Sequence, residues 1–304
     1  MDEASMSVDF FKDDGVFLPM LNDTGRNNFY KQALEQSAQG KVICDIGAGT
    51  GLLSVLAVQA GAKKVIAVEK NIERYQYLTE IVDSAGYGSV IETVHADFLS
   101  TNIDADLYVS ETLNTQIFGE NILDLSNHVV GRGKFIPGTI KIWIEAYQNH
   151  PVFTLDLSGS EAYEFDPRIN IDPNFANEIN SRFSEQYSLN DTVFKANQLN
   201  KLFTLLYQFK DIKLQRISKS DPLVVNLSNY TDQNNIRVRI PNESGELDNA
   251  MLVVKWEISH NSVALSSDNC WFGNVAKPMH KQFKTKPYVE FYYDPTITNW
   301  RLDY

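Results

Sequence analysis

One stretch decides the fold class of this chain: residues 42–71 read VICDIGAGTGLLSVLAVQAGAKKVIAVEKN. Two short apolar runs, 41–46 and 63–69, are bounded by glycine or charged residues and predict strands. The segment between them, 50–62, has the length and composition of a helix that ends at Gly61. A strand–helix–strand unit of this kind predicts two parallel strands with a helix packed across them.

The neighbouring segments extend this alternation of helices and strands. Residues 20–40 predict a helix that ends at Gly40. Residues 71–86 predict a second helix, whose apolar face carries Ile72, Tyr75, Leu78 and Val82. Further strands are predicted at 89–97 and 105–111. The resulting β-α-β-α-β-β order predicts a Rossmann-like α/β domain built on a parallel sheet.

The pattern changes at Pro137. Apolar and polar residues then alternate with a period of two, which is typical of half-buried strands. Such runs occupy residues 140–147, 236–241, 251–259 and 287–293. Because most of them have no helical stretch between them, they predict an antiparallel β-barrel or sandwich.

We therefore expect three parts along the chain. Residues 1–39 form an N-terminal segment and a helix that we expect over the cofactor site of the next domain, and 40–136 form this Rossmann-like domain. Residues 137–304 form the β-domain. Within it, a polar and partly helical insert at about 161–203 is too long for a plain loop.

The overall composition excludes several classes of function. Hydrophobic residues make up 43% of the chain and charged residues 22%, which is ordinary for globular domains. The net charge of −12 argues against nucleic acid as the main partner, and fits either a cationic partner or plain solubility. Cys44 and Cys270 form no metal-ligand pattern, so we expect no metal site. Without an apolar leader or membrane span, we expect a cytoplasmic protein, with the nucleus as the alternative.

The loop DIGAGTG, residues 45–51, joins the first strand of this unit to its helix. Its glycines, Gly47, Gly49 and Gly51, permit a tight turn and a close approach to a ligand. Glu69 stands 22 positions after Gly47, where an acid in nucleoside-binding units accepts hydrogen bonds from ribose hydroxyls. The G-x-G-x-G spacing differs from that of pyrophosphate sites and favours S-adenosylmethionine over NAD. Asp97 is either an adenine contact or a turn or capping acid.

A second candidate site is VSETLNTQIFGE, residues 109–120. Glu111 follows a predicted strand, and Glu120 follows a Phe–Gly pair that predicts a turn. The two glutamates are nine positions apart with no Lys or Arg between them. Taken alone, such a pair is typical of solvated loop charges, so its interpretation depends on the rest of the sequence.

Three segments together resemble a known family. Residues 20–30, 42–71 and 109–120 are similar, in order and spacing, to sequence blocks of the protein arginine N-methyltransferases. The resemblance is clear over about residues 20–136 and weaker beyond. It implies an S-adenosylmethionine-dependent methyltransferase that acts on arginine in a protein or peptide. The sequence of the third block, residues 109–120, is most similar to that of the monomethylating (type III) branch.

The resemblance also implies roles for individual residues. Glu111 and Glu120 match the pair that holds the guanidinium of the substrate arginine. Arg26 matches the arginine that pairs with the carboxylate of the cofactor. The cofactor loop and the ribose acid of the family match Asp45, Gly47, Gly49, Gly51 and Glu69.

One loop departs from the family pattern. Asp23 matches an acid that, in the family, pairs with the histidine of a Thr-His-Trp loop. The corresponding stretch here is DNCWFGN, so Trp271 matches while Asn269 and Cys270 stand at the Thr and His positions. His260, His280 or a water would have to replace that histidine.

Two other functions are compatible with the sequence. The acceptor could be a small guanidino or amine metabolite, or the chain could be a catalytically weak structural partner of a related methyltransferase. The altered Thr-His positions are the feature that leaves the structural-partner alternative open. The insert at 161–203 stands where the family carries a dimerisation arm. We therefore expect a homodimer, with a surface insertion as the alternative.

Overall fold

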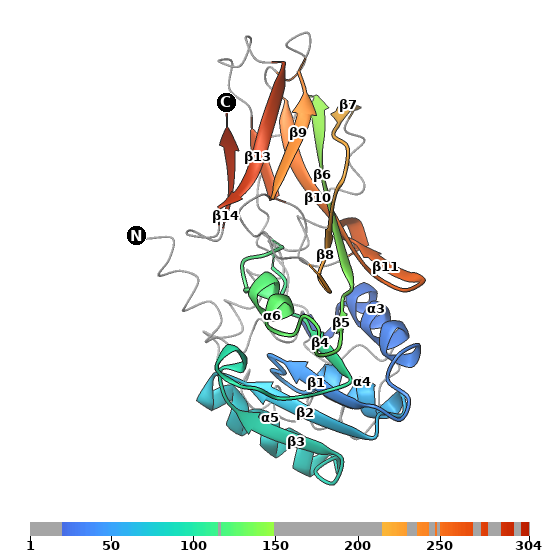
Figure 1. Cartoon of the computed structure of the whole chain (residues 1–304). Coiled ribbons are helices and arrows are strands. Elements are labelled where there is room, and N and C mark those ends of the chain that lie inside the picture. Colours follow the sequence, from blue (N-terminus) through green and yellow to red (C-terminus); the bar gives the residue numbers. More distant parts are fainter. Residues whose placement is uncertain are drawn as a thin grey trace, which may run out of the picture. The chain divides into compact units, whose positions relative to one another are not determined.

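The computed structural model of the chain describes part of its length (Figure 1). The described residues are 20–114, 117–148, 215–229, 236–242, 247, 250–269, 275–278, 287–294 and 299–303. Among them, residues 20–98 belong to one compact unit, and the residues from 99 onward belong to a second. The predicted N-terminal segment up to residue 19 and the predicted insert at 161–203 lie outside the described residues.

The first unit is a parallel α/β arrangement. Its elements are α3 (Thr24–Glu35), β1 (Val42–Ile46), α4 (Leu52–Gln59), β2 (Lys64–Glu69), α5 (Ile72–Ser84) and β3 (Ile91–His95). The strands pair in parallel in the order β3-β2-β1, as strand–helix–strand connections require (Figure 1). A short 3-10 helix, η2 (Phe98–Ser100), follows β3.

Two details of the predicted helices are wrong. The helix expected to reach Gly40 ends at Glu35, and Gly40 with φ 71° belongs to the turns that lead into β1. Ile72, expected on the apolar face of the next helix, is 48% exposed at the start of α5. The predicted positions Leu78 and Val82 are buried, and they are joined by Ile81, so the second half of α5 contacts the core.

The second unit begins with a parallel pair of strands. β4 (Leu107–Ser110) and β5 (Lys134–Ile136) are joined through α6 (Ile122–His128) and pair in parallel. The compact units thus divide at Phe98, inside the predicted 40–136 domain, while the parallel strands continue to Ile136.

The rest of the second unit is antiparallel. Its strands are β6 (Thr139–Gln148), β7 (Gln215–Lys219), β8 (Leu223–Asn226), β9 (Arg237–Pro241), β10 (Met251–His260), β11 (Val263–Ser266), β12 (Val275–Pro278), β13 (Tyr288–Asp294) and β14 (Asn299–Asp303), with a 3-10 helix, η5 (Ser267–Asn269), after β11. One sheet has the order β11-β10-β6-β7, with β12 also on β10 and β8 on β6; another has the order β14-β13-β9. A parallel sheet followed by antiparallel sheets confirms the predicted fold class; closure into a barrel or sandwich stays a prediction.

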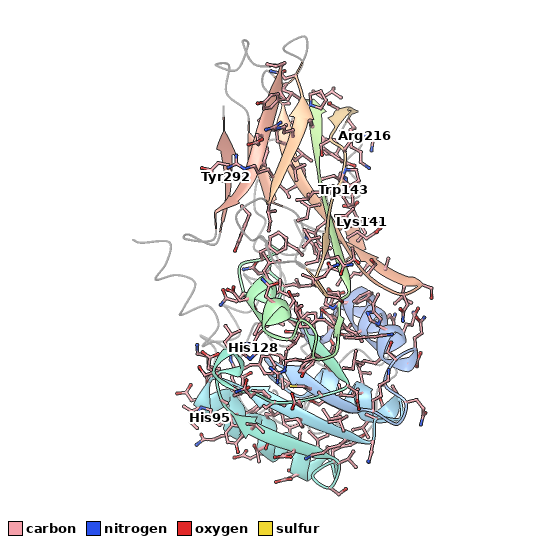
Figure 2. All side chains as sticks on the ribbon, in the orientation of Figure 1. His95, His128, Lys141, Trp143, Arg216 and Tyr292 are labelled. Carbon is pink, nitrogen blue, oxygen red and sulfur yellow. The ribbon has the colours of Figure 1, made fainter. Side chains whose placement is uncertain are left out.

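The period-two alternation of β6 explains its two faces. Ile140, Ile142 and Ile144 are fully buried and stand opposite apolar residues of β10. Burial of each such side chain stabilises the fold by about 1.5–3 kcal/mol. On the alternate positions, Trp143 of β6 and Arg216 of β7 both donate to Oε1 of Glu145, at 3.0 and 3.3 Å. Trp143 and Arg216 are labelled in Figure 2.

No helix within the described ranges is long and apolar enough to cross a membrane.

Candidate functional site

The glycine loop of the first unit folds back onto the end of β2. The backbone amides of Gly47 and Ala48 both donate to the carbonyl of Val68, at 2.9 and 3.0 Å. Gly47, Gly49 and Gly51 have φ values of 73°, 56° and 86°, in the left-handed region that favours glycine. The predicted tight turn is therefore present between β1 and α4.

Glu69 lies at the end of β2 and its carboxylate is held by two backbone amides. Oε2 accepts from Gly49 at 3.1 Å, and Oε1 accepts from Asn71 at 2.9 Å. The residue is 6% exposed. Two charge-assisted bonds fix the direction of the carboxylate. The structure thus brings together Glu69 and the glycine loop, as predicted from their spacing.

Asp45 is the first residue of this loop and is almost completely buried. Its Oδ2 accepts from the hydroxyl of Ser54 on α4 at 2.6 Å. Its Oδ1 is buried and has no hydrogen-bond partner among the described residues. Burial raises the pKa of Asp45 to about 7, an effect that hydrogen bonds from Ser54 oppose and the charge of Glu69 reinforces. Asp45 therefore has an acceptor oxygen that is free to bind a ligand donor.

Sequence reasoning missed two neighbours of these acids. Ser54 supports Asp45, and the available signal was a hydroxyl within the otherwise apolar segment LLSVLAV. Asn71 supports Glu69 through its backbone amide, and its own side chain caps α5 by accepting from the amide of Arg74 at 3.0 Å. A backbone contact of this kind leaves no sequence signal.

Arg26 and Asp23 are both buried, at 5% exposure. Oδ1 of Asp23 accepts from the backbone amide of Arg26 at 3.0 Å and so caps the start of α3. The guanidinium of Arg26 donates to the carbonyl of Met20 at 2.8 Å and to Asn27 Oδ1 at 3.4 Å. The sequence prediction did not include the capping role of Asp23.

Asp97 follows β3, the neighbour of β2, so it lies at the same carboxyl edge as Glu69. Its Oδ2 forms an ion pair with Lys70 Nζ at 2.6 Å. The side chain of Lys70 is 75% exposed, so the pair lies at the surface and contributes little to stability. Asp97 is thus placed where a nucleoside would bind in an open α/β sheet.

In the second unit, Glu111 and Glu120 stand at the two ends of one loop between β4 and α6. Both are half-buried. Inside the loop, Asn114 accepts from two later residues: its carbonyl from the amide of Ile117 at 2.8 Å, and its Oδ1 from the amide of Gly119 at 3.3 Å. The predicted turn at the Phe–Gly pair is present and leads directly into α6.

The altered loop of the β-domain is partly described. Trp271, Cys270 and His280 lie outside the described residues, while Asn269 ends η5. Asp268 forms an ion pair with Lys255 of β10. His260 ends β10 and is buried. Within the described ranges, no group of three or more His, Cys, Asp or Glu side chains could hold a metal ion.

Comparisons with curated proteins match between about a third and a half of the chain. No family model matches it. Human protein arginine N-methyltransferase 9 is 35% identical over 117 residues, which is 36% of this chain and 14% of that protein. Protein arginine N-methyltransferase 6 of Xenopus laevis is 34% identical over 136 residues, 43% of this chain and 39% of that protein. The match therefore spans well under half of each relative.

Comparisons with solved structures cover nearly the whole chain. The Trypanosoma brucei PRMT1 enzyme–prozyme heterotetrameric complex with AdoHcy contains a chain with a TM-score of 0.61 and 16% identity, covering 95% of this chain and 93% of that chain. A crystal structure of PRMT6 gives a TM-score of 0.59 at 15% identity, covering 96% and 98%. At these identities the likeness shows the fold. The chain is thus related in sequence, over about a third of its length, to the protein arginine N-methyltransferases, and it has their fold.

Proposed function

We propose that the protein is an S-adenosylmethionine-dependent protein arginine N-methyltransferase. The observation that carries this proposal is the pair Glu111 and Glu120 at the two ends of the loop between β4 and α6. In a chain related to the arginine methyltransferases, two carboxylates so placed suit a planar cation with several donors. The matched region spans 14% and 39% of the two relatives, so substrate and activity are proposals that rest on the residues of the site.

The first unit carries groups that fit S-adenosylmethionine. Glu69 presents a carboxylate in a fixed direction, which suits the ribose hydroxyls. Asp45 has a buried oxygen that accepts no hydrogen bond from the described part of the chain, and the glycine loop leaves room for close approach. We assign Arg26 to the carboxylate of the cofactor and Asp97 to the adenine side. The cofactor supplies an electrophilic methyl group on a sulfonium.

The two glutamates perform the positioning that this reaction needs. They bracket the guanidinium with charge-assisted hydrogen bonds and hold one terminal nitrogen in line with the methyl group. They also favour positive charge on the other nitrogens, which leaves the reacting nitrogen with a more available lone pair. As the N–C bond forms, that nitrogen loses a proton to a glutamate oxygen or to water. Trp271, which matches the family tryptophan, is assigned to the substrate side.

Glu111→Gln tests the clamp. We expect kcat with an arginine peptide to fall at least about a hundredfold, because misplacement of the reacting nitrogen is costly. The dissociation constant for S-adenosylhomocysteine should stay unchanged. The measurement is transfer of label from the methyl-labelled cofactor, with a lysine-substituted peptide as the acceptor control. Asp124→Asn, at a site in the first turn of α6, is the matched variant and should keep wild-type turnover.

Equal label in the lysine peptide, or label in small molecules but not in peptide, would contradict the proposed acceptor. Wild-type turnover that survives in Glu111→Gln would contradict the clamp.

We further propose that the protein assembles as a homodimer through the insert at 161–203. The support is the place of this insert in the chain, which matches the arm of the family, and the multi-subunit assembly of the Trypanosoma brucei complex. Light scattering should give the mass of a dimer for the full chain and of a monomer after deletion of residues 165–195. An unchanged mass in the deletion variant would refute the role of the insert.

A further inference from the structure

The turn that contains Glu120 is closed by a hydrogen bond to the backbone carbonyl of Phe118. The backbone amide of Asn121 donates to the carbonyl of Phe118 at 3.2 Å. Gly119 and Glu120 are the two corner residues of this four-residue turn. Because Glu120 lies between the two bonded groups, its backbone direction depends on where the carbonyl of Phe118 points.

A tyrosine from the far end of the chain binds the same carbonyl. The hydroxyl of Tyr293 on β13 donates to the carbonyl oxygen of Phe118 at 3.0 Å, in a buried position. The two rings also meet edge to face, with centroids 5.1 Å apart and planes at 66°. Phe118 is 1% exposed and Tyr293 is 4% exposed. The phenol therefore holds both the side chain and the backbone of Phe118.

The strand that carries this hydroxyl, β13, is held in place by backbone pairing. It pairs with β9 on one edge and β14 on the other. The amide of Tyr293 itself donates to the carbonyl of Ile236 at 3.0 Å. A side chain on a strand that is paired on both edges has little freedom to move its hydroxyl away.

The loop that receives this contact contains a strained residue. Ile117, next to Phe118, has φ 62° and is 1% exposed. A β-branched residue in the left-handed region is an outlier that persists when the surrounding structure holds it in place. The contact from Tyr293 acts on the adjacent residue and so supplies part of that restraint.

We propose that Tyr293 is a positioning residue for methyl transfer: its hydroxyl fixes the turn that aims Glu120 at the substrate guanidinium. This inference rests on the proposed function for the role of Glu120. The residue acts through Phe118 and is not a group that contacts the substrate.

Tyr293→Phe tests the inference because it removes the hydroxyl and keeps the ring. We expect kcat/KM for an arginine peptide to fall about tenfold, the effect expected for loss of one buried hydrogen bond. The dissociation constant for S-adenosylhomocysteine should stay within about twofold of wild type. Hydrogen exchange at the amides of Gly119, Glu120 and Asn121 should become faster.

Tyr292→Phe is the matched control. Tyr292 is the preceding residue of β13 and contacts Arg237, whose Cζ lies 5.4 Å from its ring centroid, rather than the loop. This variant should leave both the exchange of the turn and kcat/KM unchanged. Unchanged exchange and kcat/KM in Tyr293→Phe would overturn the inference, as would a uniform rise in exchange over the whole unit. If wild type methylates no arginine peptide, the proposed function fails, while the exchange of the turn still decides whether Tyr293 holds it.

Discussion

Among single residues, Asp45 combines deep burial with an incomplete set of hydrogen bonds. Ser54 serves one carboxylate oxygen, and the other has no partner among the described residues. Desolvation therefore dominates and raises the pKa from the ordinary 3.8 to about 7. A ligand that donates to the second oxygen would favour the ionised form and bring the pKa back down.

The raised pKa of Asp45 predicts a particular dependence of stability on pH. Between about pH 4 and 7 the unfolded carboxyl has lost its proton while the folded one keeps it, so rising pH favours the unfolded state. The free energy of unfolding of wild type, relative to Asp45→Asn, should fall by about 1 kcal/mol per pH unit over this range and level off above it. Urea unfolding of both proteins without ligand at pH 5, 6, 7 and 8 measures this. Parallel pH curves for the two proteins would contradict it.

Local spacing explains which single residues could be predicted. Glu69 and the glycine loop were found because one βαβ unit brings them together over a short sequence separation. Tyr293 could not be found in this way, because its contact with Phe118 joins residues 175 positions apart. A single sequence contains no signal for such a pairing, which depends on the packing of β13.

At the scale of elements, the start of α4 depends on the conformation of one glycine. Gly51 is the N-cap of α4, with φ 86°, and a Cβ added there would lie 2.9 Å from Cδ1 of Leu78 on α5. Leu78 is fully buried, so it has little room to give way. Gly51 thus permits both the turn of the glycine loop and the close packing of α4 and α5.

Gly51→Ala should therefore lower the free energy of unfolding by about 2–3 kcal/mol, from backbone strain plus steric overlap. Gly86→Ala separates the two effects. Gly86 has φ 84°, but an added Cβ would meet nothing within 4 Å, so strain alone should cost about 1 kcal/mol. Urea unfolding gives both values. Equal losses in the two variants would show that Leu78 moves aside and that the packing argument is wrong.

The elements themselves were largely predictable, because apolar periodicity is a local property. The strands at 140–147, 236–241, 251–259 and 287–293 are confirmed as β6, β9, β10 and β13. The end of α3 was misjudged since Gln36, Ser37 and Ala38 suit a helix. The amides of Ser37 and Ala38 both bond the carbonyl of Leu34, which ends the helix in a turn. Such competition between local hydrogen bonds is not visible in residue types.

At the scale of the whole molecule, the net charge of −12 matters for a cationic substrate. A strongly acidic protein attracts basic peptides over distances comparable to the Debye length. If the acceptor is an arginine-rich peptide, kcat/KM should fall roughly severalfold between low and high salt. A peptide with one arginine and no net charge is the control and should show little change. Equal salt dependence for both peptides would contradict this steering.

The global fold was predictable in class but not in detail. The change from parallel to antiparallel strands follows from the switch in periodicity near Pro137. The division into compact units at Phe98 left no trace in composition, because β4 has the same apolar character as the strands before it. Long-range packing decides such a boundary.

Fragmentation mass spectrometry of a reacted peptide is the sharpest test of whether this protein methylates the guanidinium of arginine. Wild type with S-adenosylmethionine should add one or two methyl groups, located on the terminal nitrogens of arginine. Glu111→Gln should add none under the same conditions. A wild-type protein that binds the cofactor but leaves arginine unmodified, or that places the methyl group on another side chain, would contradict the claim.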